Sequence, residues 1–524
     1  MSIAARRMQR TQPVTGGGTG PAMATFSGVS TSLIATHSVG GTVNLTGTSL
    51  CYVALFKGGV QEGDRIIVNS ASSTLSILSP ATSGTYTVRA YSTRSGGTLL
   101  GESAGITVAG SSTLISPAYF VSPTGSDTNP GSQAAPFLTF EKARDTIRAG
   151  GSTKTVYIRG GTYSPAAKFL LNNYDNNTKW LAYPGETPVI DGGGTLNDIW
   201  FFDAGARNIT LHGVTFQNVY CCAVNLNGYN NAGSDTGTIE GVVVANCTIK
   251  TVLPNPADIY ADYGAIRATS FIRNNVFRNN YIQDCGGPGI ALVAGGGTEF
   301  NFGNKVIRNK IINSNNQGRA DTGGIYMLDR GYTGQVANPT IIDGNYIENA
   351  GSGSDTKLLY LDDQASKVVV SNNIMCGLAH WAFQLHGSDY ITMQNNIFDI
   401  SDQTVPSGYY LALYQNANTY TNYGMTNNVF TGNVVYDAGG YAKTTMWDII
   451  DESTEGITMP SVSGNIYYKT TGQLPNGGQV VDSSPYFINP NLTNPAGRDY
   501  SFTSTSGINQ IGFTPITQSF IGPQ

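Results

Sequence analysis

The sequence has few charged residues and no long apolar run. Asp, Glu, Lys and Arg make up 12% of its 524 residues, about half of the usual share. The 29 Lys and Arg residues do not outnumber the 34 Asp and Glu residues, so we expect no nucleic-acid partner. No stretch of about 18 apolar residues occurs, so we expect no membrane span. No apolar segment follows the basic start MSIAARRMQR, and the sequence therefore predicts no secretory signal.

Cysteine and histidine are also scarce. The chain has six Cys and four His residues, and no two Cys residues are separated by two positions. Zinc sites and redox motifs need such spacings. We therefore expect six buried, reduced thiols and no metal bound by cysteine.

Glycine and aromatic residues are plentiful. There are 65 Gly, 29 Tyr and 20 Phe residues, and apolar residues reach 40%. This apolar content is too high for a disordered chain, and the glycines lack the three-residue period of collagen. The composition indicates an all-β protein with an uncharged polar surface.

The composition changes along the chain. Residues 1–24 predict a flexible arm rich in Gly, Thr and Pro. Residues 25–112 contain short runs of alternating polarity separated by Gly and Ser turns, which predict a small Ig-like β-sandwich. Residues 117–524 form the larger region, and we expect it to be a separate catalytic domain.

The larger region repeats a short pattern, an Asn or Gly followed by two apolar residues. Successive copies are 23 to 37 residues apart, and this drifting period favours a β-solenoid, in which loops vary in length while the strands stack. A leucine-rich repeat would need a regular Leu frame, and a propeller would need four strands per repeat. We predict a right-handed parallel β-helix with Asn residues stacked at one turn. The pattern is centred on Gly213, Asn246, Asn280, Asn309, Asn345, Asn373, Asn396, Asn433 and Asn465.

An amphipathic segment precedes the repeats. Residues 137–149 place Phe137, Phe140, Ala143 and Ile147 on one helical face, and two glycines follow. We predict a helix that caps the first coil and protects its strand edges.

One strand recurs before each Asn and carries polar residues at alternate positions. We align GAIRAT, GIALVA, GIYMLD, LLYLDD, AFQLHG, LALYQN and MWDIID, with Ile325, Leu359, Phe383 and Leu411 directed into the coil. The outward positions then form a face that suits a sugar, with aromatic rings for stacking and polar groups for hydroxyls. The candidate substrate-binding residues on this face are Arg267, Tyr326, Tyr360, Gln384, His386 and Tyr414.

Three aspartates on this face are candidate catalytic residues. Asp329 ends one strand, and Asp362 and Asp363 end the next. Aligning Tyr326 with Tyr360 puts Asp329 level with Asp363, and a shift of one residue puts it level with Asp362. Either way carboxylates lie on adjacent coils, about 4.8 Å apart in the backbone, and glycoside hydrolysis uses such a pair. The alternatives are aspartates that only form turns and a calcium site.

Several segments resemble known sequences. YFVSPTGSDTNPGSQAAPFLTFEKARDTIR, VYIRGGTYSPAAKFLL and YPGETPVIDGGG resemble the opening coils of carbohydrate-active right-handed parallel β-helix proteins. GGIYMLDRGY, DGNYIENA and LYLDDQAS are similar to the central stretch of the fucosidase- and xylanase-type β-helix glycoside hydrolases. The resemblance implies catalysis by two aspartates, Asp329 with Asp362 or Asp363.

These observations predict a glycoside hydrolase that cleaves a bacterial or plant polysaccharide without a cofactor. The predicted absence of a signal also suits a phage tail spike, which reaches polysaccharide outside the cell by virion assembly, as a monomer or homotrimer. A polysaccharide lyase on the same fold is the main alternative, and it would use Ca²⁺ or Arg267 to neutralise a uronate and His386 or Tyr360 as the base. A carbohydrate-binding solenoid without activity is the third hypothesis.

Overall fold

The chain consists of two compact units, Met1–Thr113 and Leu114–Gln524. The computed structural model describes residues 114–229, 235–253, 262–296, 299–316, 321–330, 338–351, 355–402, 411–416, 425–439, 445–451 and 457–523, and before them 23–27, 32–34, 38–39, 42–46, 51–57, 60–68, 72–74, 77–78, 84–92 and 98–109. The predicted arm at 1–24 lies almost wholly outside these residues.

The first unit is a sandwich of mostly antiparallel strands, in which only the described pair β2 and β11 is parallel. Its two main sheets share one core, in which Val43 and Leu45 pack with Val53, Tyr86 and Val88. One sheet contains β1 (Met23–Ser27), β4 (Thr42–Thr46) and β7 (Ser72–Thr74). The other contains β2 (Ser32–Ile34), β11 (Ile106–Ala109), β9 (Gly84–Tyr91), β5 (Cys51–Lys57) and β6 (Val60–Val68), with β10 (Leu99–Glu102) paired to β9. A two-stranded sheet joins β3 (Ser38–Val39) and β8 (Ile77–Leu78).

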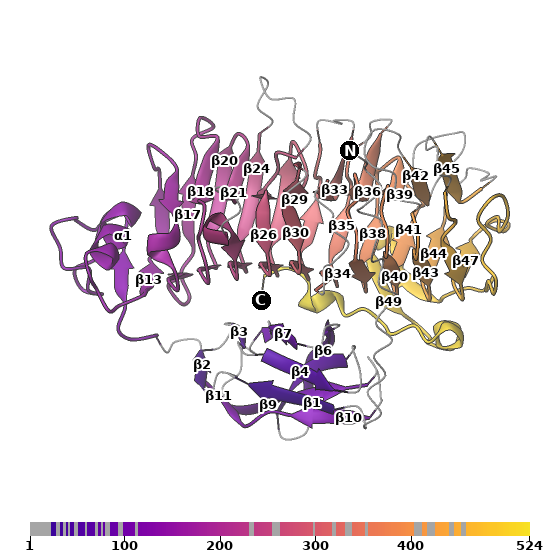
Figure 1. The fold of residues 1–524 in the computed structure, drawn as a ribbon, viewed down its shortest axis with the longest axis horizontal. Coiled ribbons are helices and arrows are strands. Elements are labelled where there is room, and N and C mark those ends of the chain that lie inside the picture. The colour runs from indigo at the N-terminus through magenta and orange to yellow at the C-terminus, as the bar shows by residue number, and fades with distance from the viewer. Residues whose placement is uncertain are drawn as a thin grey trace, which may run out of the picture. The chain divides into compact units, whose positions relative to one another are not determined.

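The second unit is the predicted right-handed parallel β-helix, and Figure 1 shows its coils stacked side by side. The coils contribute their strands to three long parallel sheets, whose apolar inner faces form one continuous core. The first sheet has twelve strands: β12 (Tyr119–Val121), β13 (Thr155–Ile158), β16 (Lys179–Ala182), β19 (Thr210–His212), β23 (Val243–Ala245), β27 (Val276–Arg278), β31 (Lys305–Ile307), β34 (Thr340–Asp343), β37 (Val368–Ser371), β40 (Thr392–Gln394), β43 (Val429–Thr431) and β46 (Ser461–Ser463). The second has eleven: β14 (Gly161–Tyr163), β17 (Pro188–Asp191), β20 (Thr215–Val219), β24 (Thr248–Val252), β28 (Tyr281–Cys285), β32 (Lys310–Ile312), β35 (Tyr346–Glu348), β38 (Ile374–Cys376), β41 (Ile397–Asp399), β44 (Val434–Asp437) and β47 (Ile466–Lys469).

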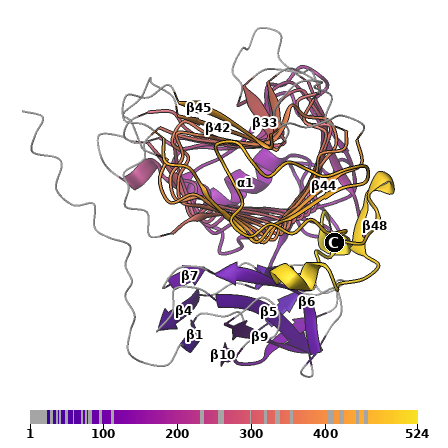
Figure 2. The same ribbon diagram turned by 90° about the vertical axis from the view of Figure 1, so that its right-hand side faces the viewer.

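The third sheet carries the polar face that the sequence predicts. Figure 2 looks along the stack and shows β33, β42 and β45 along one side of the coils. The sheet has ten strands: β15 (Phe169–Leu171), β18 (Asp198–Phe202), β21 (Cys222–Asn227), β25 (Ile266–Thr269), β29 (Ile290–Ala294), β33 (Thr322–Asp329), β36 (Thr356–Asp362), β39 (Trp381–His386), β42 (Ala412–Asn416) and β45 (Trp447–Asp451). Shorter sheets join β22 (Ile239–Glu240), β26 (Phe271–Arg273) and β30 (Phe300–Phe302), and β48 (Leu492–Asn494) with β49 (Asp499–Phe502).

The repeated asparagines form the predicted ladder at one turn. The side-chain amide of Asn373 donates to Oδ1 of Asn396 at 2.9 Å and to the carbonyl of Ile342, while its own Oδ1 accepts from Asn345. Asp482 ends the ladder, because its carboxylate only accepts. Nδ2 of Asn465 donates to Oδ2 of Asp482 at 2.7 Å. The buried rungs are Asn280, Asn309, Asn345, Asn373, Asn396, Asn433 and Asn465. Asn246 is not a rung, because Cys247 occupies that position. The backbone N–H of Cys247 donates to Oδ1 of Asn280, the first rung.

One α-helix lies at the start of the solenoid. Helix α1 (Phe140–Arg148) begins after Thr139, whose hydroxyl accepts from the backbone N–H of Lys142, so the helix is shorter than the predicted 137–149. Phe140 and Ile147 are buried in the core of the first coils, and the ring of Phe140 packs at 5.6 Å from that of Trp200. The apolar helical face therefore covers the end of the stack.

The chain after the last coil returns along the second sheet, as the yellow segment in Figure 1 shows. Tyr500 donates from its hydroxyl to Asp399 at 2.7 Å, and Asn279 donates to the carbonyl of Gly522. This segment also has short 3-10 turns at Pro495–Gly497, Ile508–Ile511 and Gln518–Phe520, and two others occur at Asn173–Asp175 and Asp235–Gly237.

All six cysteines are buried and none is in a disulfide, as predicted. Among the described residues, no helix is long and apolar enough to cross a membrane.

Candidate active site

The third sheet aligns the polar residues of neighbouring coils. Tyr326 of β33 pairs with Tyr360 of β36, which pairs with Gln384 of β39. The same register puts Asp362 beside Leu328. Because the alternate residues of these strands are buried in the core, the side chains of Tyr326, Tyr360, Gln384 and Asp362 lie on the outer face.

The strands of this sheet bend, and the bend explains one error in the sequence alignment. In several strands two consecutive residues are buried in the core at this point, such as Leu358–Leu359 in β36 and Ala382–Phe383 in β39. In β42 this pair is Leu411–Ala412, and Ala412 rather than Leu411 is the partner of Phe383. A shift by one residue exchanges the two faces of a strand.

Tyr414 therefore does not face the predicted groove. Its side chain is fully buried in the core, and its hydroxyl donates to the carbonyls of Met425 and Thr458 at 2.8 Å. Gln415 takes the predicted position beside His386. The prediction that Tyr414 binds substrate is wrong.

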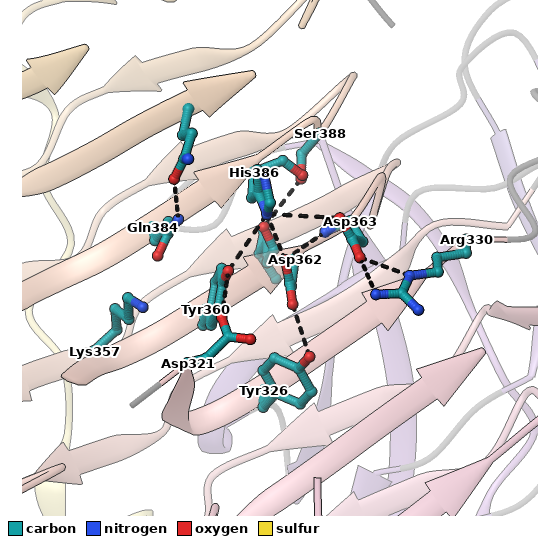
Figure 3. Close-up of polar contacts among 12 residues, drawn as sticks. Asp321, Tyr326, Arg330, Lys357, Tyr360, Asp362, Asp363, Gln384, His386 and Ser388 are labelled. Atoms are coloured by element: carbon teal, nitrogen blue, oxygen red, sulfur yellow. Dashed lines mark hydrogen bonds and ion pairs between the residues drawn. The ribbon is translucent and has the colours of Figure 1, made fainter. Parts of the chain in front are cut away.

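Asp362 is the centre of the polar contacts in Figure 3. Its Oδ2 accepts from the hydroxyl of Tyr326 at 2.7 Å, and its Oδ1 lies 2.6 Å from Nδ1 of His386. The residue is only 3% exposed. Three strands thus hold one buried carboxylate in a fixed orientation.

Asp363 lies on the same side as Asp362 because the backbone leaves the strand there. Successive strand residues normally face opposite sides, but Asp363 has a φ of +35°, in the left-handed region that Asp tolerates better than most residues. Its carboxylate accepts from Arg330 at 2.5 Å and lies 3.7 Å from His386 Nδ1. The turn therefore brings two sequential carboxylates together.

Asp321 belongs to the same network, and sequence reasoning missed it. It precedes β33, and its side chain accepts from the hydroxyl of Tyr360 at 3.1 Å. The residue as a whole is exposed, but its carboxyl group is partly shielded from water. The same hydroxyl lies 3.4 Å from Nδ1 of His386. A signal was present, because an Asp directly precedes the Thr that begins both β33 and β36, and Asp355 lies 34 residues after Asp321.

The surroundings shift the pKa values of these carboxyl groups in opposite directions. Burial alone would raise the pKa of Asp362, but the hydrogen bond and positive charge of His386 and the hydroxyl of Tyr326 bring that pKa below its usual value. Burial, followed by the negative charge of Asp362, raises the pKa of Asp363 and, separately, that of Asp321. Burial would lower the pKa of His386, but Asp362 raises it. One carboxylate is thus held charged beside two that retain protons more readily.

Asp329 and Arg267 have different surroundings. Asp329 is buried at the end of β33 and pairs with Ala294 of β29. It lies two residues after the core residue Met327, so strand alternation puts both on the same side of the sheet. Arg267 of β25 donates to Asp262 at 2.7 Å and lies over the ring of Tyr263. The network thus centres on Asp362, and the pairing of Asp329 with Asp362 or Asp363 stays a prediction.

A cation could in principle use Asp362, Asp363 and His386, since one atom from each lies within 4.8 Å of the others. Calcium prefers six to eight oxygen ligands. Both oxygens of Asp362 already accept hydrogen bonds, from Tyr326 and from the backbone N–H of Asp363. These three residues therefore do not fit a calcium site.

Comparisons with known proteins support the fold. Residues 119–246 match the family model "Pel9A-like, right handed beta helix region". The chain is 32% identical over 97 residues to pectate lyase PEL9 of Emericella nidulans, which covers 18% of this chain and 23% of that protein. The chain thus spans about a quarter of the length of the curated relative that it matches.

Solved structures give similarity at low identity. One is a glycoside hydrolase with a TM-score of 0.34 and 11% identity, covering 60% of this chain and 96% of that one. A rhamnogalacturonan lyase has a TM-score of 0.36 and 13% identity, covering 72% and 90%. A complex of XylC with xylose has a TM-score of 0.33 and 13% identity, covering 70% and 76%.

The residues matched by the family model precede β33, so they do not include the network around Asp362. The resemblance to carbohydrate-active right-handed β-helix proteins, read from the sequence, is confirmed.

Proposed function

We propose that this chain is a glycoside hydrolase that cleaves a polysaccharide on the outer face of its third sheet. The observation that carries the proposal is the buried Asp362, held charged by His386 and Tyr326, beside carboxyl groups whose pKa is raised. Glycoside hydrolysis requires one carboxylate and one carboxylic acid on either side of the scissile bond. Neighbouring groups with opposite pKa shifts provide that division of roles.

Asp362 is the carboxylate in this proposal. It either attacks the anomeric carbon or removes a proton from the attacking water. The hydroxyl of Tyr326 and the ring of His386 fix its two oxygens, so little reorganisation is needed when charge develops.

Asp321 is the acid in this proposal. The residue is open to solvent, and its carboxyl group, shielded beside Tyr360 and close to the charge of Asp362, holds its proton more readily than an ordinary Asp. It would protonate the leaving glycosidic oxygen. Asp363 shares the raised pKa but is paired with Arg330, so we assign it to positioning. Asp329 remains a candidate and belongs in the same test.

The test is a set of Asp→Asn variants assayed on a polysaccharide that the wild-type chain cleaves. An amide keeps the shape but cannot carry the proton, so Asp362→Asn and Asp321→Asn should each lose about 100-fold to 10,000-fold in kcat. Asp145→Asn, at an exposed side chain of α1, is the control and should keep full activity. Normal rates for both Asp362→Asn and Asp321→Asn would refute the assignment.

The second candidate is a polysaccharide lyase, which the partial match to a pectate lyase favours. It would require a uronate substrate, and His386 or Tyr360 would remove the proton next to the uronate carboxyl. β-Elimination leaves a conjugated double bond that absorbs ultraviolet light, whereas hydrolysis leaves only new reducing ends. Binding with no change in polymer length would instead support a carbohydrate-binding solenoid.

A further inference from the structure

A second group of side chains lies beside Asp362 on the same sheet. The bend in β39 turns Ala382 and Phe383 into the core, so Trp381 and Gln384 on either side of them both face outward. Lys357 of β36 pairs in register with Trp381. Its Nζ lies 5.7 Å from the ring centroid of Trp381 and 4.3 Å from that of Tyr360. These residues are therefore continuous with the network around Asp362, as Figure 3 shows for Lys357, Tyr360 and Gln384.

Two polar atoms in this group have no hydrogen-bond partner among the described residues. They are Nε1 of Trp381 and Oε1 of Gln384, in residues that are 8% and 2% exposed. Nε2 of His386, on the same strand, is also buried without a hydrogen-bond partner among these residues. Burying an unpaired donor or acceptor destabilises a fold, so such atoms at a candidate site point to a ligand that supplies the partners. A sugar hydroxyl both donates and accepts, and it suits an indole N–H and an amide oxygen.

Three cations of this face, among the residues that the structure describes, are paired with carboxylates. Lys357 binds Asp355 at 2.5 Å, and Arg330 binds Asp363 at 2.5 Å. Arg267, further along the sheet, binds Asp262. A uronate would have to displace one of these carboxylates and would add its charge to that of Asp362. The charge balance therefore favours an uncharged sugar.

We propose that Trp381, Gln384 and Lys357 form a subsite for an uncharged sugar residue next to Asp362, with Nε1 of Trp381 donating to one hydroxyl and Oε1 of Gln384 accepting from another. The subsite rests on the proposed function and narrows it to neutral sugars at this position. Its residues hold the substrate and take no part in bond cleavage.

The first test separates binding from chemistry. Trp381→Phe keeps the aromatic face and removes the N–H, and Gln384→Met keeps the length and removes the acceptor. Each should raise KM about fivefold to tenfold, the effect of one neutral hydrogen bond, with kcat within about threefold of wild type. Trp200→Phe is the matched control, because Nε1 of Trp200 also has no hydrogen-bond partner in the described part of the chain, but the residue lies in the core. It should lower the melting temperature and leave KM unchanged.

Unchanged KM in both Trp381→Phe and Gln384→Met, in a chain that cleaves polysaccharide, would overturn the subsite while leaving the proposed function intact. If either variant fails to fold, as judged by circular dichroism, the other variant and the binding test below decide.

The second test is binding of the Asp362→Asn variant to a glycan array that carries neutral glycans and uronate-containing glycans as separate groups. Binding to neutral glycans that Trp381→Phe weakens supports the subsite. Binding confined to uronate glycans overturns it and favours the lyase. Binding to neither group counts against the proposed function and the subsite that rests on it.

Discussion

Replacement of Asn373 by Ala should strongly destabilise the solenoid. Asn373 is fully buried and takes part in four side-chain hydrogen bonds. Its Oδ1 accepts from the backbone and side-chain nitrogens of Asn345, and its Nδ2 donates to the carbonyl of Ile342 and to Asn396, all at 2.8 to 2.9 Å. At about 1 kcal/mol each, their loss should cost about 4 kcal/mol.

Some atoms that bond to Asn373 keep a second hydrogen-bond partner in the Asn373→Ala variant. The expected loss in free energy of unfolding therefore stays at about 4 kcal/mol. Nδ2 of Asn345 still donates to the carbonyl of Val306, and Oδ1 of Asn396 still accepts from the backbone N–H of residue 373. The backbone N–H of Asn345 loses the acceptor that Asn373 gave it and stays buried.

The assay is a denaturant titration, which reports the free energy of unfolding when the chain refolds on dilution. Asn509→Ala, at an exposed position, is the control and should change stability by less than about 0.5 kcal/mol. If Asn373→Ala is no less stable than Asn509→Ala, the ladder does not hold the coils together and the reasoning fails.

Two further predictions concern pH and the returning C-terminal segment. The pair of His386 and Asp362 should stabilise the fold fully below the ordinary His pKa of about 6.5. This stabilisation should be lost as the pH rises through the raised pKa of His386, and also in acid, where Asp362 takes up a proton. His386→Ala should therefore differ from wild type most near pH 5 to 6 in denaturant titrations, and an equal difference at pH 9 would contradict this. Tyr500→Phe removes the donor to the buried Asp399 and should cost about 1.5 to 3 kcal/mol in the same titrations. Tyr174→Phe, at a side chain that is 71% exposed, should cost nothing, and equal losses for the two tyrosines would refute that role.

Much of the fold was predictable because its signal repeats. The asparagines from Asn280 to Asn465 recur at the same turn of every coil, and each must be an amide to donate and accept along the stack. The face that carries Tyr326, Tyr360 and Asp362 followed from strict alternation, which holds over the few residues after the bend.

The errors at the site arise where alternation stops. The bend buries two consecutive residues, so Leu411 and Ala412 were both plausible partners of Phe383, and the wrong choice turned Tyr414 outward. The left-handed backbone of Asp363 depends on the contacts of the folded chain and has no simple periodic signal. Asp321 lies just before β33, outside the residues whose polarity alternates. The only sequence signal for it is the Asp-Thr pair, which recurs at 355–356.

Product analysis tests the central claim most directly. The purified chain would be incubated with a panel of neutral and uronate-containing polysaccharides, next to the Asp362→Asn variant. The account predicts shortened chains with new reducing ends and no ultraviolet-absorbing double bond, and it predicts that Asp362→Asn abolishes them. Unsaturated products, or an Asp362→Asn variant that cleaves at the wild-type rate, would contradict it.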